Sequence, residues 1–379
     1  MTGVIKDSWC DLPTDVLNAI SERLLYVEQI HFRSVCKSWR SNTNPLKHAA
    51  DKLPWVMSFK EIYHVYRFDI GVTGSNGLSG VVNSSLFYLY DPSQKRKYTL
   101  QNEILNGANV HASKHGWLLL SKKKYAGKRM PSSFFIFYTP FTHKIIQLPE
   151  LHKTNGYSKA TFSTAPTSPD CLIFVLTAYD KKHYVSTCRL GDNRWRTVSF
   201  DGEYGKIDSV AFVGGVFYCL FSYKHMMASF KVDQKEWKIH SHPWTRNGNL
   251  VVDQHLVESH DGNLLVSCLY LDHSQKIFRY DQLDMKWFNI ENLGNTLLFL
   301  GVTSMLLPAI EEASELASTI HEAGHRLNSF IFGIRFSDCG TPRIPLWQQS
   351  YEDSKRTKIH DRNGNEDWKK IWIQPLKQT

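Results

Sequence analysis

A repeated pair of short strands is the feature that most constrains how this chain can fold. Each copy has an apolar strand, a polar turn that usually contains Asp or Thr, and a second strand led by an aromatic or aliphatic residue. This pattern is typical of a β-hairpin. Five copies stand at residues 87–100, 135–148, 187–198, 229–239 and 277–290. They recur every ~40 to ~55 residues, which is the spacing expected of the blades of a β-propeller.

A second element recurs between these hairpins. A turn that contains Gly, Asp or Pro precedes a short and very apolar strand, at residues 115–120, 168–174, 213–218 and 260–266. A strand without polar alternation is expected to be buried on both faces, as the inner strands of a propeller are. The two elements together give four strands a blade, so we predict a mainly β fold with kelch-like blades. A β-sandwich is the alternative, but such regular repetition disfavours it.

The blade repeats are clearest over residues 81–292, and both ends of the ring are less distinct. Residues 346–360 are a candidate sixth hairpin, and residues 55–59 are candidates for a strand that helps to close the ring. Residues 308–325 interrupt the rhythm. They are rich in Ala and Glu, and Ile310, Ala313, Ala317 and Ile320 have the spacing of one helix face. We predict a helical insertion there.

The N-terminal segment, residues 8–50, has a different pattern, which predicts three short helices. The first begins near Pro13, which suits a first helical turn because its missing N–H has no partner there, and Asp11 can cap it. Four apolar residues then share one face, namely Val16, Leu17, Ile20 and Leu24. A second helix fits residues 27–32 and a third fits residues 34–40. Three helices of this size form a small core that gains stability from a partner.

Two separated motifs give this helical segment a family resemblance. Leu-Pro-Thr-Asp-Val-Leu at residues 12–17 and Phe-Arg-Ser-Val-Cys-Lys-Ser-Trp-Arg at residues 32–40 resemble the two halves of an F-box. The resemblance implies an F-box over residues 8–50 that docks on the Skp-type adaptor of a Skp–cullin–F-box ubiquitin ligase. It implies docking or supporting roles for Leu12, Pro13, Leu17, Ile20, Leu24, Val35, Cys36 and Trp39. The alternative is a three-helix cap packed on the rest of the chain.

The remainder of the chain, residues 51–379, resembles the KIB-type β-propeller of a large family of plant F-box proteins. The matching segments are Gly-Trp-Leu-Leu at 116–119, Phe-Tyr-Thr-Pro-Phe-Thr at 137–142, Ile-Gln-Leu-Pro at 146–149 and Trp-Ile-Gln-Pro at 372–375. In that family the propeller is taken to recruit the protein that is ubiquitylated. The resemblance therefore implies a non-catalytic substrate receptor that needs no cofactor, and it leaves the target protein unknown.

One short motif offers a rival chemistry. Residues 321–325 read His-Glu-Ala-Gly-His, which matches H-E-x-x-H, the helical zinc motif of metalloproteases. On a helix, His321 and His325 would lie one turn apart and bind zinc, and Glu322 would activate a water molecule. The metzincin continuation is absent, strand-like residues follow at 330–334, and Gly324 favours the end of a helix. A solvated helix end is therefore the favoured interpretation, with a zinc-dependent hydrolase as the alternative.

Composition limits the remaining classes. The formal net charge is +9, but its densest cluster, Lys122, Lys123, Lys124, Lys128 and Arg129, reads as a solvated loop, so a nucleic-acid partner is not expected. The seven cysteines form no C-x-x-C pair and mostly lie in apolar runs, as buried small hydrophobes do. The first residues contain no apolar signal-peptide core, and no apolar run approaches the roughly 20 residues of a spanning helix. We expect no membrane association and a location in the nucleus, the cytoplasm or both.

Three hypotheses follow from the sequence. The leading one is a ligase subunit in which the F-box binds the adaptor, and through it a cullin, while the propeller binds a protein target. The second is the zinc-dependent hydrolase centred on His321. The third is a propeller binding protein whose F-box acts outside a ligase.

Overall fold

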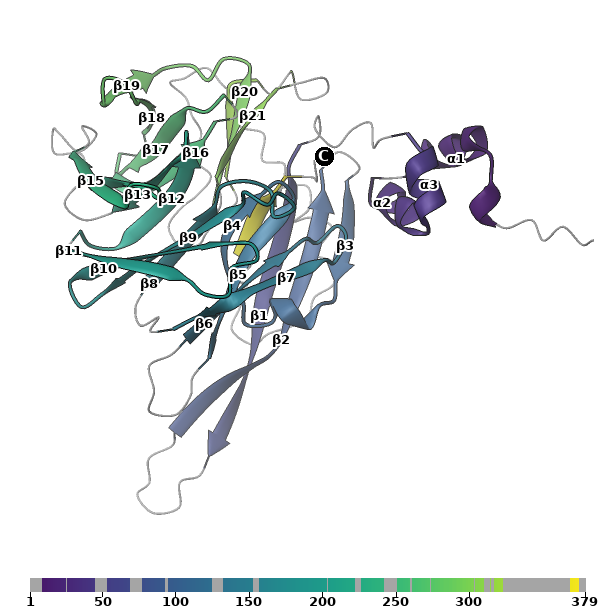
Figure 1. Cartoon of the computed structure of the whole chain (residues 1–379), viewed down its shortest axis with the longest axis horizontal. Helices are drawn as coiled ribbons and strands as arrows, with labels where there is room; N and C mark the ends of the chain where they lie inside the picture. Colours follow the sequence, from purple (N-terminus) through teal and green to yellow (C-terminus); the bar gives the residue numbers. More distant parts are fainter. Residues whose placement is uncertain are drawn as a thin grey trace, which may run out of the picture.

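The computed structural model describes residues 9–24, 26–44, 53–68, 77–92, 95–124, 132–152, 157–202, 204–221, 226–241, 251–259, 261–272, 274–302, 304–309, 314, 317–322 and 369–374. Three short helices come first and strands make up nearly all the rest (Figure 1). The mainly β fold and the helical N-terminal module predicted from the sequence are both confirmed. The candidate sixth hairpin at residues 346–360 lies outside the described residues.

The helical module begins with a 3-10 turn, η1 (Trp9–Asp11), which is followed by α1 (Thr14–Ser21), α2 (Tyr26–Ser34) and α3 (Lys37–Asn42). Pro13 is the N-cap of α1 and not part of its first turn, and no side chain caps that helix, so the capping role predicted for Asp11 is wrong. Asp11 instead ends the 3-10 turn. Cys36 caps α3, because its Sγ accepts a hydrogen bond from the backbone N–H of Trp39 at 3.5 Å.

Four consecutive antiparallel sheets form the body of the propeller, each with four strands in chain order, and the last of them continues past its first strand into three later strands, which makes it seven-stranded. Their strands are β4 (Asn109–Lys114), β5 (Trp117–Lys124), β6 (Ser132–Tyr138), β7 (Ile145–Leu151); β8 (Tyr157–Phe162), β9 (Leu172–Tyr179), β10 (Lys182–Arg189), β11 (Arg196–Asp201); β12 (Ile207–Val213), β13 (Val216–Phe221), β14 (Met226–Lys231), β15 (Glu236–Ser241); β16 (Val251–Glu258), β17 (Leu264–Tyr270), β18 (Gln275–Asp281) and β19 (Lys286–Ile290). The first strands of neighbouring sheets contact one another, from β4 to β8, β12 and β16. We name these four sheets blades B, C, D and E.

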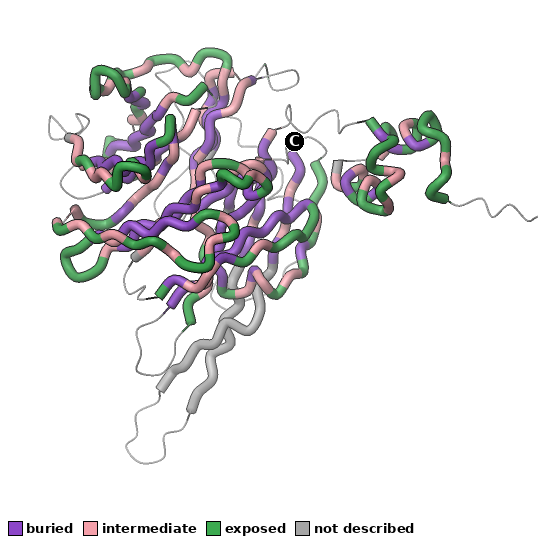
Figure 2. Tube along the Cα trace, in the orientation of Figure 1, coloured by how far each residue is buried: buried purple, intermediate pink, exposed green. Residues whose placement is uncertain are grey.

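The strongly apolar strands occupy the second position in each blade. Every residue of β13 and of β17 is buried, which confirms that these runs are enclosed on both faces. The fourth strands are mostly exposed, with the alternation expected of a strand at the rim, as in β11 and β19. Burial therefore runs from the interior of the ring outwards (Figure 2). Hydrophobic clusters lie between successive blades, because each sheet presents apolar side chains to both neighbours.

The ring is closed by strands from the two ends of the chain. A further sheet, blade A, pairs β23 (Lys369–Ile373) with β1 (Trp55–Phe68), β2 (Gly77–Asp91) and β3 (Arg96–Leu100). Trp55 faces Ile373 and Phe59 faces Lys369 in the antiparallel register, which confirms that residues 55–59 take part in closure. The paired strands β1 and β2 are longer than the others (Figure 1).

The segment between blades E and A corrects one prediction. It contains β20 (Thr296–Leu300), β21 (Met305–Pro308) and β22 (Thr319–Glu322), and β22 pairs in parallel with β20. The helical insertion predicted for residues 308–325 is therefore wrong over residues 319–322. The helical spacing of Ala317 and Ile320 is a local signal, whereas pairing with the buried strand β20 satisfies both the backbone and the apolar side chains.

Candidate adaptor-docking site

The helical module has a compact interior that holds its two motifs together. Leu17 is completely buried, and the rings of Phe32 and Trp39 lie 4.4 Å apart. The indole N–H of Trp39 donates to the backbone oxygen of Trp9 at 2.7 Å, which ties α3 to the turn before α1. Arg33 donates from Nη1 to three oxygens of Thr43 and Asn44, at 2.7–2.9 Å. These hydrogen bonds hold the helices in a defined arrangement although the apolar interior is small.

Apolar side chains remain exposed on the outside of this module. Trp9 is 77% exposed, Val35 62%, Val16 40% and Ile20 38%. Val16 and Ile20 are four residues apart on α1, so they lie on one side of that helix. Large apolar residues that are this exposed on so small a module are typical of a protein-binding surface. We name these four side chains the outer apolar set.

The predicted docking residues divide into three groups by exposure. Ile20, Val35 and Pro13 are exposed, whereas Leu17 lies in the interior and supports the module. Leu12, Leu24, Cys36 and Trp39 are intermediate in exposure. Their roles in docking stay predictions. No docking role was predicted for Trp9 or Val16, although Val16 was placed on the same helix face as Ile20, which is a signal that could have assigned it one.

One helix of the module packs on the propeller. Ile30 of α2 is 8% exposed and belongs to the same buried cluster as Trp55, Leu105 and Phe141. At the edge of this contact, Glu28 Oε1 lies 3.9 Å from Arg96 Nη1. Burial, followed by the nearby His31, lowers the pKa of His143 on the propeller side. The alternative of a purely structural cap therefore explains α2, but it leaves the outer apolar set without a role.

The axis of the propeller carries a polar network that links four blades. Glu258 of β16 accepts a hydrogen bond from Lys114 Nζ of β4 at 2.5 Å and another from the backbone N–H of Phe212 in β12. Lys114 also donates to the backbone oxygen of Phe162 in β8 at 2.9 Å. The two charged side chains are 19% and 25% exposed, so the pair is largely shielded from water. Such a network holds the first strands together, which is a structural role.

The described residues of the rival zinc motif, His321 and Glu322, lie in a strand and not in the helix that its chemistry requires. His321 lies in β22, is 4% exposed and stacks on Phe299 with ring centroids 5.0 Å apart. Its Nε2 lies 2.8 Å from Thr319 Oγ1. His325 lies outside the described residues, and among those that are described no cluster of three or more His, Cys, Asp or Glu could hold a metal ion.

Cys171, Cys188, Cys219 and Cys268 are buried, as expected of small hydrophobes, and burial raises the pKa of Cys171 and Cys188 to about 11. Within the described part of the chain, no helix is long and apolar enough to cross a membrane. Lys122, Lys123 and Lys124 end strand β5, whereas Lys128 and Arg129 lie outside the described residues.

Comparison with known proteins agrees with this architecture. The F-box domain family model matches residues 9–45, and the KIB1-4 beta-propeller model matches residues 89–317. F-box/kelch-repeat protein At1g57790 of Arabidopsis thaliana is 29% identical over 301 residues, which cover 78% of this chain and 77% of that protein. F-box protein At3g56470 of the same plant is 25% identical over 304 residues, which cover 78% and 73%.

Solved structures add only a remote likeness. A putative 6-phosphogluconolactonase from Bacteroides fragilis is 12% identical, and the alignment covers 65% of this chain and 83% of that one with a TM-score of 0.33. An overlap this low supports no argument about function. The family models are decisive, because the propeller match alone spans more than half of the chain. The chain belongs to the KIB1-4 beta-propeller family and carries an F-box domain at its N-terminal end.

Proposed function

We propose that this protein is the substrate-recognition subunit of a Skp–cullin–F-box ubiquitin ligase. The F-box binds the Skp-type adaptor and, through it, the cullin, and the propeller binds the protein to be ubiquitylated. The chain itself supplies no catalytic group, and it acts in the nucleus, the cytoplasm or both. The observation that carries the proposal is an F-box whose outer apolar set remains exposed while α2 packs on the propeller.

The physical reasoning concerns what each part can offer a partner. Burial of an exposed side chain such as Val35 or Ile20 contributes about 1.5–3 kcal/mol when it is complete. The α2 contact joins the F-box to the buried cluster of blade A, so an adaptor and a target can be held in a defined relation by one chain. A propeller offers loops on a rigid ring for recognition, which suits a receptor.

Co-purification tests the adaptor half of the proposal. Tagged full-length protein from plant cells should retrieve a Skp-type adaptor and a cullin. The double variant Ile20→Asp/Val35→Asp should lose both, because it places two charges where apolar side chains are buried on docking. Leu283→Asp is the matched control, since Leu283 is 95% exposed on blade E. It should retrieve both partners at the wild-type level.

The same experiment separates the ligase from other roles. Retrieval of the adaptor without a cullin would favour a binding protein that acts outside a ligase. Failure of the wild type to retrieve either protein would contradict the proposal. Leu12→Ala/Pro13→Ala is a second docking variant, and circular dichroism should show that its propeller remains folded.

A further inference from the structure

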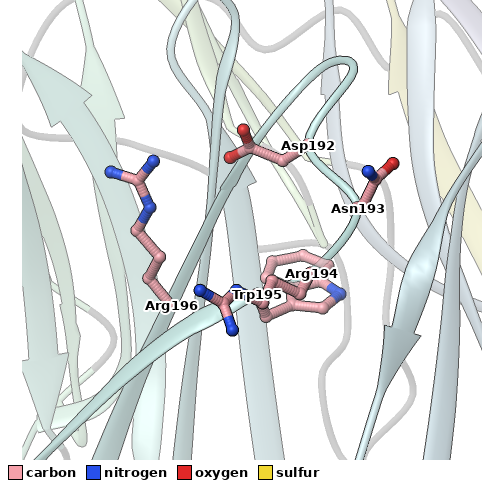
Figure 3. Close-up of a pocket in the computed structure, with 5 residues that line it drawn as sticks. All are labelled: Asp192, Asn193, Arg194, Trp195 and Arg196. Atoms are coloured by element: carbon pink, nitrogen blue, oxygen red, sulfur yellow. The ribbon is translucent and has the colours of Figure 1, made fainter.

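The turn between β10 and β11 carries an unusual concentration of arginine. Arg189, Arg194 and Arg196 are all exposed within eight residues, and Asp192 is the one carboxylate among them. In the part of the chain that the structure describes, none of the three arginines lies within 4.0 Å of a carboxylate. Arg194 and Arg196 also line a surface pocket with Asp192, Asn193 and Trp195, and Figure 3 shows these five side chains. We name Arg189, Arg194 and Arg196 the arginine turn.

This turn is held in place by its neighbours. The indole N–H of Trp195 donates to the backbone oxygen of Pro149 on blade B at 2.7 Å, and its ring lies 5.4 Å from that of Phe135. Asp192 Oδ2 accepts a hydrogen bond from the backbone N–H of Arg189 at 3.0 Å, which fixes the other side of the turn. The Asp192 carboxylate is thus already engaged. The guanidinium groups therefore project from a backbone that is anchored on two sides.

The propeller contains an internal comparison for this arrangement. The corresponding start of β15 in blade D reads Glu236-Trp237-Lys238, and its tryptophan is also packed, 5.1 Å from Phe200. There, Lys238 Nζ and Glu236 Oε1 lie 2.9 Å apart and neutralise each other. The tryptophan is thus a structural element that the blades share. In blade C the corresponding positions on either side of Trp195 hold Arg194 and Arg196, so two positive charges take the place of the Glu and Lys pair.

The chemistry of this turn points to an anionic partner. A guanidinium group forms a planar fork that matches a carboxylate with two parallel hydrogen bonds. Figure 3 shows the guanidinium groups of Arg194 and Arg196 on the same side of the turn, so both can face one extended segment. The net charge of +9 further favours the approach of acidic partners over long range.

We propose that the arginine turn binds an acidic, carboxylate-bearing segment of a partner protein. The inference rests on the proposed function in one respect, since the partner would be a target held by the propeller. It names a recognition surface on the rim of blade C, between blades B and C, and a chemical class for the segment recognised there. The chemistry expected is Asp or Glu side chains paired with Arg194 and Arg196.

A binding assay with defined peptides tests this proposal. The probe is a fluorescent peptide of alternating Glu and Gly, compared with the same peptide in which Gln replaces Glu. Fluorescence anisotropy with the full-length protein should show about tenfold tighter binding of the Glu peptide, which corresponds to about 1.4 kcal/mol. The preference should shrink as ionic strength rises, because exposed charges are screened by salt. Equal binding of both peptides by the wild type would overturn the proposal.

Two charge-reversal variants locate the surface. Arg194→Glu reproduces the opposite-charge pattern of blade D and should abolish the preference for the Glu peptide. Lys235→Glu makes the same change of net charge on the exposed turn between β14 and β15 and should retain it. Equal losses in both variants would mean a general effect of net charge and would contradict the proposal. Selective binding of a phosphoserine peptide in place of the Glu peptide would overturn the carboxylate assignment.

Retrieval of the adaptor keeps the two proposals separate. Arg194→Glu should retrieve the Skp-type adaptor as well as the wild type does, because the change lies on the propeller. Loss of peptide preference with intact adaptor retrieval supports the arginine turn. A wild type that binds the Glu peptide but retrieves no adaptor would contradict the proposed function and leave the arginine turn supported.

Discussion

One buried side chain contributes strongly to closure of the ring, and its removal should give a large and measurable effect. Trp372 of β23 is 1% exposed, and its indole N–H donates to the backbone oxygen of Leu300 in β20 at 2.9 Å. Its ring also meets that of Phe299 edge to face, with centroids 4.9 Å apart. One side chain therefore connects blade A to the strands that follow blade E.

The expected loss of stability on replacing Trp372 follows from these contacts. Replacing a fully buried Trp by Ala costs about 3–5 kcal/mol. Leaving the Leu300 carbonyl without its donor adds about 1 kcal/mol or more. We therefore expect Trp372→Ala to lower the free energy of unfolding by about 4–6 kcal/mol. Trp372→Phe keeps most of the apolar volume and should cost about 1–3 kcal/mol, mainly through the lost hydrogen bond.

Urea denaturation followed by intrinsic fluorescence measures these differences, because other tryptophans report the transition. Leu283→Ala is the control, since its side chain is 95% exposed and the change should remain within about 0.5 kcal/mol of the wild type. A loss below about 1 kcal/mol for Trp372→Ala would refute the reasoning that β23 stabilises the ring.

Three further predictions concern other parts of the propeller. Burial, followed by the charge of Lys159, lowers the pKa of His111 to about 3, so as the pH falls below about 6.5 this histidine takes up a proton in the unfolded chain but not in the folded protein. His111 should therefore reduce the free energy of unfolding by up to about 1.4 kcal/mol between pH 7.5 and 5.5. His111→Gln should flatten that part of the pH profile of the urea midpoint. Glu258→Gln should lower the free energy of unfolding by about 2–3 kcal/mol, which is less than the loss expected from breaking a fully buried ion pair, because Lys114 and Glu258 are partly exposed. Calorimetry measures this loss. Lys235 has a φ of 49° before β15, so Lys235→Gly should stabilise the protein by about 0.5–1 kcal/mol in urea denaturation, and a loss would contradict the strain argument.

The blades were predictable because their signals are local and repeated. Apolar runs such as residues 213–218 mark strands by composition alone, and the turns between hairpins recur with similar residues. The structure also reveals a regularity in backbone conformation that the sequence does not show. The residue just before the fourth strand takes a positive φ in several blades, as Lys95, Lys235 and Met285 do, although none of these is Gly.

Long-range pairing explains what the sequence could not predict. The apolar residues up to Ile320 have helical spacing, but parallel pairing with β20 makes residues 319–322 a strand. The docking module shows the same limit, because Leu17 and Ile20 share one helix face and yet one is buried and the other exposed. Which apolar side chain faces the interior depends on how α3 packs against α1 and η1, and spacing alone does not specify that packing.

The pairing of β1 with β23 has a consequence for synthesis. The F-box leaves the ribosome before the propeller does, whereas the strand that completes blade A emerges after the other strands of the ring. A nascent or prematurely terminated chain would therefore possess a finished adaptor-binding end and an open ring. Under the proposed function, such a product would occupy the Skp-type adaptor without presenting a complete surface for the target. Proteins truncated before residue 369 should therefore compete with the intact protein for the adaptor, so an early stop codon should do more than remove the intact protein.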